Sequence, residues 1–71
     1  MRIKLSDPAQ LRSLVLFLTF DQNIVVTTIG ESEIEVGFVG SLNVRAQQRE
    51  TELRLRAWME SHPGAIAVLS E

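Results

Sequence analysis

Few side chains in this sequence are suited to catalysis, and His62 is the clearest of them. It is the single histidine, and the chain contains neither cysteine nor tyrosine. A lone imidazole can serve as a general base or as a pH sensor. However, His62 is followed directly by Pro63-Gly64, a pair that ends helices. We therefore expect His62 to cap the end of a helix, and we expect no catalytic residue in this chain.

Two carboxylates, Glu33 and Glu35, are the next candidates for chemistry. They are two residues apart in a predicted strand, so their side chains lie on the same face. Such a pair could bind a hard cation or perform acid–base work. The residues predicted to lie opposite them, Arg2 and Lys4, are basic, which favours ion pairs on a solvated face. Since cysteine is also absent, the sequence predicts no metal site, no cofactor and no enzyme.

Arginine side chains suggest a different chemistry, the binding of phosphate. Six of the seven basic residues are arginines, and arginine recognises phosphate well. Arg45, Arg49 and Arg56 lie in one predicted helix, so a nucleic-acid accessory role is one alternative. Against this role, Glu52 and Glu60 interrupt the basic stripe and the net charge is -2. The predicted sheet also lacks the exposed aromatic residues that stack on RNA bases.

The first two elements are predicted from alternation and capping. Residues 2–5 alternate polar and apolar side chains, as a half-buried strand does. Asp7 suits the N-cap of a helix, Pro8 suits its first position, and Gln10 could complete a capping box. This helix is expected to end near Thr19. Its apolar stripe consists of Leu11, Leu14, Val15 and Leu18.

A hairpin and a second helix are expected next. Residues 24–29 are β-branched throughout and favour a strand. Residues 33–38 alternate strictly and predict the partner strand of a hairpin. A longer helix is expected within residues 42–61. In its second half the apolar positions fall on one stripe that includes Trp58, which we expect to anchor this helix on the sheet.

The last strand is predicted over residues 65–69. If Ile66 and Val68 point into the core, Ala65 and Ala67 lie on the outer face of the sheet, where such small residues leave a shallow floor.

This order of elements predicts one small α+β domain over residues 1–71. A strand, a helix, two strands, a helix and a strand form the βαββαβ plan, in which two helices cover one face of a four-stranded antiparallel sheet with strand order 4-1-3-2. On this order, residues 2–69 resemble the ferredoxin-like, or α/β-plait, superfamily. The run from Glu52 to Trp58, followed by His62-Pro63-Gly64, is similar to the endings of small bacterial proteins. That resemblance implies no activity.

Residues left outside the predicted core indicate a partner surface. A domain of this size buries a thin core, and a second subunit can add to it. The candidate surface residues are Leu16, Phe20, Gly37, Leu53, Ala65 and Ala67. Phe20 could instead fold back onto the core. We therefore predict a small non-enzymatic interaction or regulatory module that associates with itself or with another protein.

Two further expectations concern ligands and location. An ACT-like regulatory domain, which would bind a small metabolite beside the first strand–helix junction, is a second alternative function. Uninterrupted apolar runs such as Leu14 to Leu18 are too short to cross a bilayer. Asp7, Pro8 and Arg12 interrupt the stretch that a signal peptide would need to be apolar. We therefore expect a cytoplasmic protein without a membrane partner.

Overall fold

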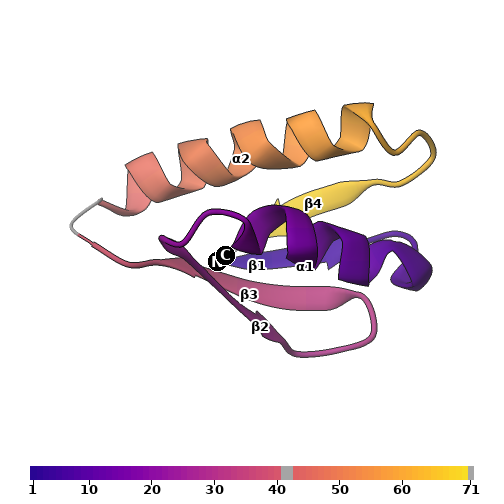
Figure 1. The fold of residues 1–71 in the computed structure, drawn as a ribbon, viewed down its shortest axis with the longest axis horizontal. Coiled ribbons are helices and arrows are strands. Elements are labelled where there is room, and N and C mark those ends of the chain that lie inside the picture. The colour runs from indigo at the N-terminus through magenta and orange to yellow at the C-terminus, as the bar shows by residue number, and fades with distance from the viewer. Residues whose placement is uncertain (41–42, 71) are drawn as a thin grey trace.

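The computed structural model describes residues 1–40 and 43–70, which form four strands, two α-helices and one short 3₁₀ turn. Along the chain these are β1 (Arg2–Leu5), the 3₁₀ turn (Pro8–Gln10), α1 (Leu11–Thr19), β2 (Ile24–Thr28), β3 (Glu33–Phe38), α2 (Val44–Glu60) and β4 (Ala67–Ser70). Figure 1 shows α1 crossing one face of the sheet and α2 running along its β4 side. The predicted α+β class, with a four-stranded antiparallel sheet and two helices, is confirmed.

The first α-helix begins later than its capping pattern predicts. Asp7 Oδ1 accepts a hydrogen bond from the backbone N–H of Ala9 at 3.0 Å, and Pro8 follows as the first residue of the turn. This cap reaches only two residues along the chain, which favours a tight 3₁₀ turn. The α-helix starts after Gln10, whose side chain makes no capping bond. The expected capping box is therefore wrong, although the cap at Asp7 is confirmed.

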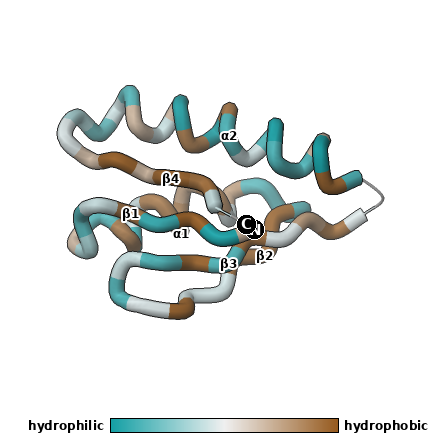
Figure 2. The backbone as a smooth tube through the Cα atoms, turned by 180° about the vertical axis from the view of Figure 1, so that it is seen from behind, coloured by the Kyte–Doolittle hydropathy of each residue, from teal (hydrophilic) through white to brown (hydrophobic). Residues whose placement is uncertain are grey.

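The strands of the sheet follow the order β2-β3-β1-β4, which reads β4-β1-β3-β2 from the other edge. All neighbouring strands are antiparallel. β1 and β3 form the central pair, in which Arg2 lies opposite Glu35 and Lys4 lies opposite Glu33. Figure 2 shows the resulting alternation of hydrophilic and hydrophobic residues along these two strands. The predicted hairpin is also confirmed, because β2 pairs with β3.

One buried cluster joins the sheet to both helices. It consists of Ile3, Leu5, Leu11, Leu14, Leu18, Ile24, Ile34, Val36, Leu55, Trp58 and Ala67. Since the inward side chains of the sheet share this cluster with residues of α1 and α2, both helices cover the same face. Trp58 is fully buried, so it anchors α2 as the sequence predicts. Burial of each such large apolar side chain contributes roughly 1.5–3 kcal/mol to stability.

The prediction for the two faces of the last strand is wrong. Ala67 is 7% exposed, whereas Val68 is 55% exposed. The cause is the register with β1, in which Ala67 lies opposite Leu5 and Val68 lies opposite Lys4. Residues directly opposite in an antiparallel pair share a face, so Ala67 takes the buried face of Leu5. Ala65 is half-buried and packs against the core as well.

The ends of α2 are set by a polar cap and a glycine. The helix begins directly after Asn43, whose Oδ1 accepts a hydrogen bond from the N–H of Ala46 at 2.8 Å. Residues 41–42, where the expected range of this helix starts, lie outside the described residues. Beyond the other end, Gly64 has a φ of 92°, which is the left-handed region that favours glycine. The predicted exit from the helix is confirmed.

Candidate partner surfaces

The outer face of the sheet, opposite the helices, carries paired charges at its centre. Arg2 Nε lies 3.8 Å from Glu35 Oε2, and Lys4 is the register partner of Glu33. The predicted placement of basic beside acidic residues is confirmed. In residues 1–40 and 43–70, no three histidine or acidic side chains come together as a group that could hold a metal ion. Glu35 also lies 3.4 Å from the N-terminal amine of Met1.

The β4 side of this outer face is apolar. Ile66 and Val68 are both more than half exposed, and the hydrophobic colour of β4 is visible in Figure 2. They adjoin a cavity of about 370 Å³. Its lining residues are Lys4, Leu5, Ser6, Ile66, Val68 and Ser70. Because Leu5 ends β1 and Ser6 follows it, this cavity lies at the first strand–helix junction.

The β2 side of the outer face is apolar too. Val25 is 52% exposed and Ile29, just after the strand, is 45% exposed. Gly37 lies opposite Val25 in the register, which confirms its predicted outward position. A Cβ added at Gly37 would meet nothing within 4 Å, so the surface is low and open there. Apolar strips thus flank the charged centre of the face on both sides.

A separate apolar surface lies on α1. Leu16 and Phe20 are one helical turn apart and are 63% and 92% exposed. Phe20 therefore does not fold back onto the core. The turn after it explains this, because the backbone N–H of Asp21 bonds to the carbonyl of Leu18 and Asp21 Oδ1 accepts from Asn23 N–H. These bonds direct the chain into β2 and leave the phenylalanine in solvent.

The six predicted surface residues do not form one surface. Leu16 and Phe20 lie together on the helical side, while Leu53, 51% exposed, lies on the outer side of α2. Gly37 lies on the opposite side of the molecule, and the two alanines belong to the core side of β4. The exposed apolar residues of the sheet were not predicted. They are Val25, Ile29, Ile66 and Val68.

A serine–histidine contact joins the two helices. Ser13 Oγ lies 3.0 Å from His62 Nε2, and Trp58 Nε1 donates a hydrogen bond to Ser13 Oγ at 3.4 Å. His62 Nδ1 lies 2.9 Å from the carbonyl oxygen of Trp58, and the two rings stack with centroids 4.3 Å apart. His62 therefore caps the end of α2, as predicted. No pattern in the sequence indicates a role for Ser13, which lies 49 residues before His62 in the chain.

This pair has the residue types of a nucleophile and its base. Neither Ser13 nor His62 lines any of three cavities, of about 370, 260 and 320 Å³, in the described part of the chain. The contacts of Ser13 with Trp58 and His62 join the first turn of α1 to the end of α2.

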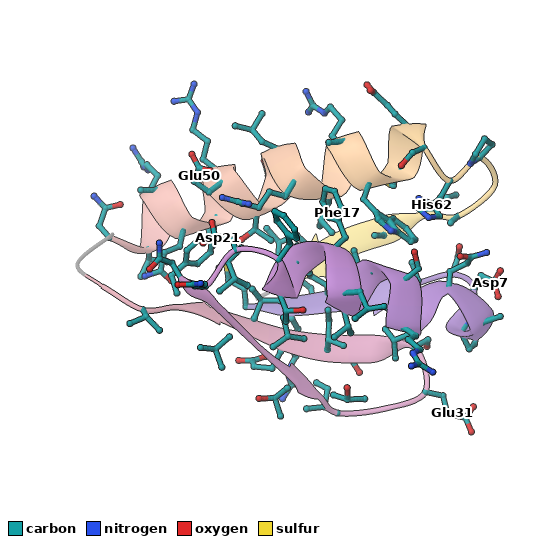
Figure 3. All side chains as sticks on the ribbon, viewed as in Figure 1. Asp7, Phe17, Asp21, Glu31, Glu50 and His62 are labelled. Atoms are coloured by element: carbon teal, nitrogen blue, oxygen red, sulfur yellow. The ribbon has the colours of Figure 1, made fainter. Side chains whose placement is uncertain are left out.

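A second polar contact holds the other end of α1. Arg54 of α2 lies 2.7 Å from Asp21 Oδ2 and 3.8 Å from Glu50. Figure 3 shows Asp21 and Glu50 near one end of the helix pair and His62 near the other. A cavity of about 320 Å³ adjoins this ion pair. Arg54 therefore joins α2 to the end of α1 through this ion pair.

The arginines proposed for phosphate binding lie on the exposed side of α2. Arg45, Arg49 and Arg56 are all exposed. Arg56 and Glu52 line the same cavity of about 260 Å³ between α2 and β4. The acidic Glu52 therefore lies beside Arg56 of the basic stripe where α2 borders β4.

In residues 1–40 and 43–70, no helix combines the length and the apolar character needed to cross a membrane. Comparison of the chain with protein-family models, with curated proteins and with solved structures found no match.

Proposed function

We propose that this chain is a ferredoxin-like α/β plait that acts as a small non-enzymatic interaction module in the cytoplasm and associates with a second copy of itself. The βαββαβ order of elements supports the proposed fold. One observation carries the proposed role. Within the described residues, ten large apolar side chains are exposed, against eleven buried apolar residues in the core.

The grouping of these side chains matters more than their number. Single exposed apolar residues are normal on protein surfaces, whereas contiguous apolar patches mark interaction sites. Ile66 and Val68 adjoin one cavity on the sheet, and Leu16 and Phe20 are neighbours on α1. A second subunit would cover such patches and add to a thin core.

Light scattering during size-exclusion chromatography tests this proposal. We expect the mass to rise from 8.0 kDa toward twice that value as the concentration increases through the micromolar range. Leu53→Ser, which changes an isolated exposed residue, is the control and should leave this curve unchanged. A mass that stays at 8.0 kDa over the whole series would contradict self-association.

A second candidate function is the binding of a small metabolite by an ACT-like domain. The cavity at the first strand–helix junction favours it, since its volume of about 370 Å³ lies within the range of ligand pockets, roughly 300–1,000 Å³. Ile66 and Val68 offer an apolar wall, and Lys4 offers a cation. This chemistry fits a small carboxylate with an apolar body.

Thermal shift measurements with amino acids and apolar carboxylates test this second candidate. At about a hundred times the dissociation constant, a ligand stabilises a protein by roughly 2.7 kcal/mol, so we expect a rise in Tm of roughly 10–20 °C. Lys4→Met keeps the side-chain length and removes the charge, and it should abolish the shift. Unchanged Tm values across the whole series would contradict metabolite binding.

A further inference from the structure

The two edge strands of the sheet differ in how well they are protected from pairing with a strand of another molecule. β2 forms one edge, and residues 24–29 contain no charge, no proline and no glycine. Natural edge strands usually carry such residues, or are covered, because their free backbone groups pair readily with other strands. Figure 1 shows β2 at the border of the sheet, on the side away from α2.

The β4 edge, in contrast, is covered. α2 runs along this side of the sheet (Figure 1). The Sδ atom of Met59 accepts a hydrogen bond from the backbone N–H of Ala67 at 3.3 Å. Charged side chains of α2, Glu52 and Arg56, line the groove between the helix and the strand. An incoming strand would therefore meet a helix and charges at β4, whereas within the described residues no helix runs along β2 (Figure 1).

The backbone of β2 determines which groups point to its open edge. The N–H of Ile29, just past the strand, donates to the carbonyl of Glu33 at 3.0 Å. Bonding alternates along an antiparallel ladder, so every second residue counted back from Ile29 bonds to β3. The residues between them turn their N–H and C=O groups outward. They are Ile24, Val26 and Thr28, but the N–H of Ile24 already donates to the carbonyl of Asp21 at 3.1 Å, so Ile24 offers only its carbonyl to an incoming strand.

We propose that two copies of this chain pair through β2, antiparallel, with Val26 opposite the partner's Val26. This proposal deepens the proposed function and rests on it. In this register Ile24 lies opposite the partner's Thr28. The N–H and C=O of Val26 then pair with the partner's Val26, and the N–H of Thr28 donates to the partner's Ile24 carbonyl. All five strand residues of each copy overlap, whereas a register shifted by two residues would leave two of the five without an opposite residue. The product is a continuous eight-stranded sheet with a two-fold axis at Val26.

The charges at this edge favour a second copy over an acidic or basic peptide. Residues 24–29 are uncharged, so a charged strand would find no opposite charge there, whereas a copy of the same strand matches it. Asp21, the nearest acid before the strand, is already paired with Arg54 at 2.7 Å. Thr28 is exposed although its side chain points to the helical side, so no helix covers that end of the strand.

The length of the seam indicates a weak dimer. Five paired residues span about 17 Å at roughly 3.4 Å per residue. Such a seam is small beside the interfaces of stable complexes, which bury roughly 1,200–2,000 Å² in total. We therefore expect association in the micromolar range.

A single-cysteine cross-link tests the register, because the chain has no cysteine of its own. Paired residues at a hydrogen-bonded site lie about 5.5 Å apart between Cα atoms, which suits a disulfide. Val26→Cys should therefore form a covalent dimer under mild oxidation. Leu53→Cys, at an isolated exposed residue of α2, is the matched control and should stay monomeric, and Val68→Cys tests whether the apolar patch of β4 forms the interface instead. Thr28→Lys adds an edge charge at an exposed site and should weaken association of the uncross-linked protein about tenfold or more.

The outcomes separate this proposal from the proposed function. If the mass still rises with concentration but Val26→Cys does not cross-link and Thr28→Lys has no effect, self-association stands and the β2 pairing is wrong. A covalent dimer of Val68→Cys alone would place the interface at β4 and overturn the pairing in the same way. A strict monomer that binds an added peptide of residues 24–29 would overturn pairing between full copies.

Discussion

Replacement of Trp58 by alanine is expected to unfold a large fraction of the protein. Trp58 is fully buried at the centre of the core, and it contacts Ser13 and His62 as well. Removing a buried tryptophan side chain costs about 3–5 kcal/mol. The whole free energy of unfolding of a domain this size is only roughly 4–10 kcal/mol. Urea titration followed by circular dichroism should therefore show a strongly reduced midpoint or no folded baseline.

Two further variants make this result interpretable. Trp58→Phe keeps most of the buried ring but removes the N–H donor to Ser13, so we expect a smaller loss of about 1–2 kcal/mol. Leu53→Ala lies on the exposed side of the same helix and should change stability by less than about 0.5 kcal/mol. Equal losses for Trp58→Ala and Leu53→Ala would contradict the packing of α2 described above.

Ala67→Glu is expected to destabilise the protein by several kcal/mol, whereas Val68→Glu is expected to be tolerated. The first change places a carboxylate on the buried face of β4, beside Leu5, and burying an unpaired charge is costly. The second places it on the outer face opposite Lys4, where we expect a change of less than about 1 kcal/mol. Urea titration of both variants at low protein concentration provides the comparison.

The neutral variant Ala67→Gln separates the effect of charge from that of size. The glutamine side chain has nearly the volume of glutamate. Ala67→Gln should therefore disrupt the packing around residue 67 to a similar extent without burying a charge. The opposite ranking, with Val68→Glu the less stable variant, would show that β4 presents its other face to the core.

The central strands illustrate what a sequence of this kind can predict. β1 and β3 each have polar residues on one face and apolar residues on the other, so the alternation alone identifies the buried side. Placing Arg2 and Lys4 beside Glu33 and Glu35 required only the order of strands in the sheet. The positions of both helices followed in the same way from the spacing of leucines and from the buried Trp58.

The last strand illustrates what could not be predicted. Both alternating sets of residues in it are apolar, so hydrophobicity favours neither face. Only the pairing with β1 decides between Ala67 and Val68, and that pairing joins residues more than sixty positions apart. The exposure of Ile66 and Val68 could not be predicted for the same reason, because it depends on this choice.

Contacts between polar residues that are distant in the sequence could not be predicted either. Nothing in the spacing of Ser13 and His62 indicates that they lie 3.0 Å apart. Likewise, the uncharged stretch of residues 24–29 is visible in the sequence. Its importance appears only when the strand order places β2 at an uncovered edge.

The two polar contacts at the ends of α1 have a consequence for how the molecule opens. Ser13 with His62 and Asp21 with Arg54 hold α1 to α2 at both ends. Neither helix can then lift from the sheet without breaking a contact to the other. We expect amide hydrogen exchange in the buried turns of α1 and α2 to occur through one shared sub-global opening, since helices joined in this way behave as a single cooperative unit.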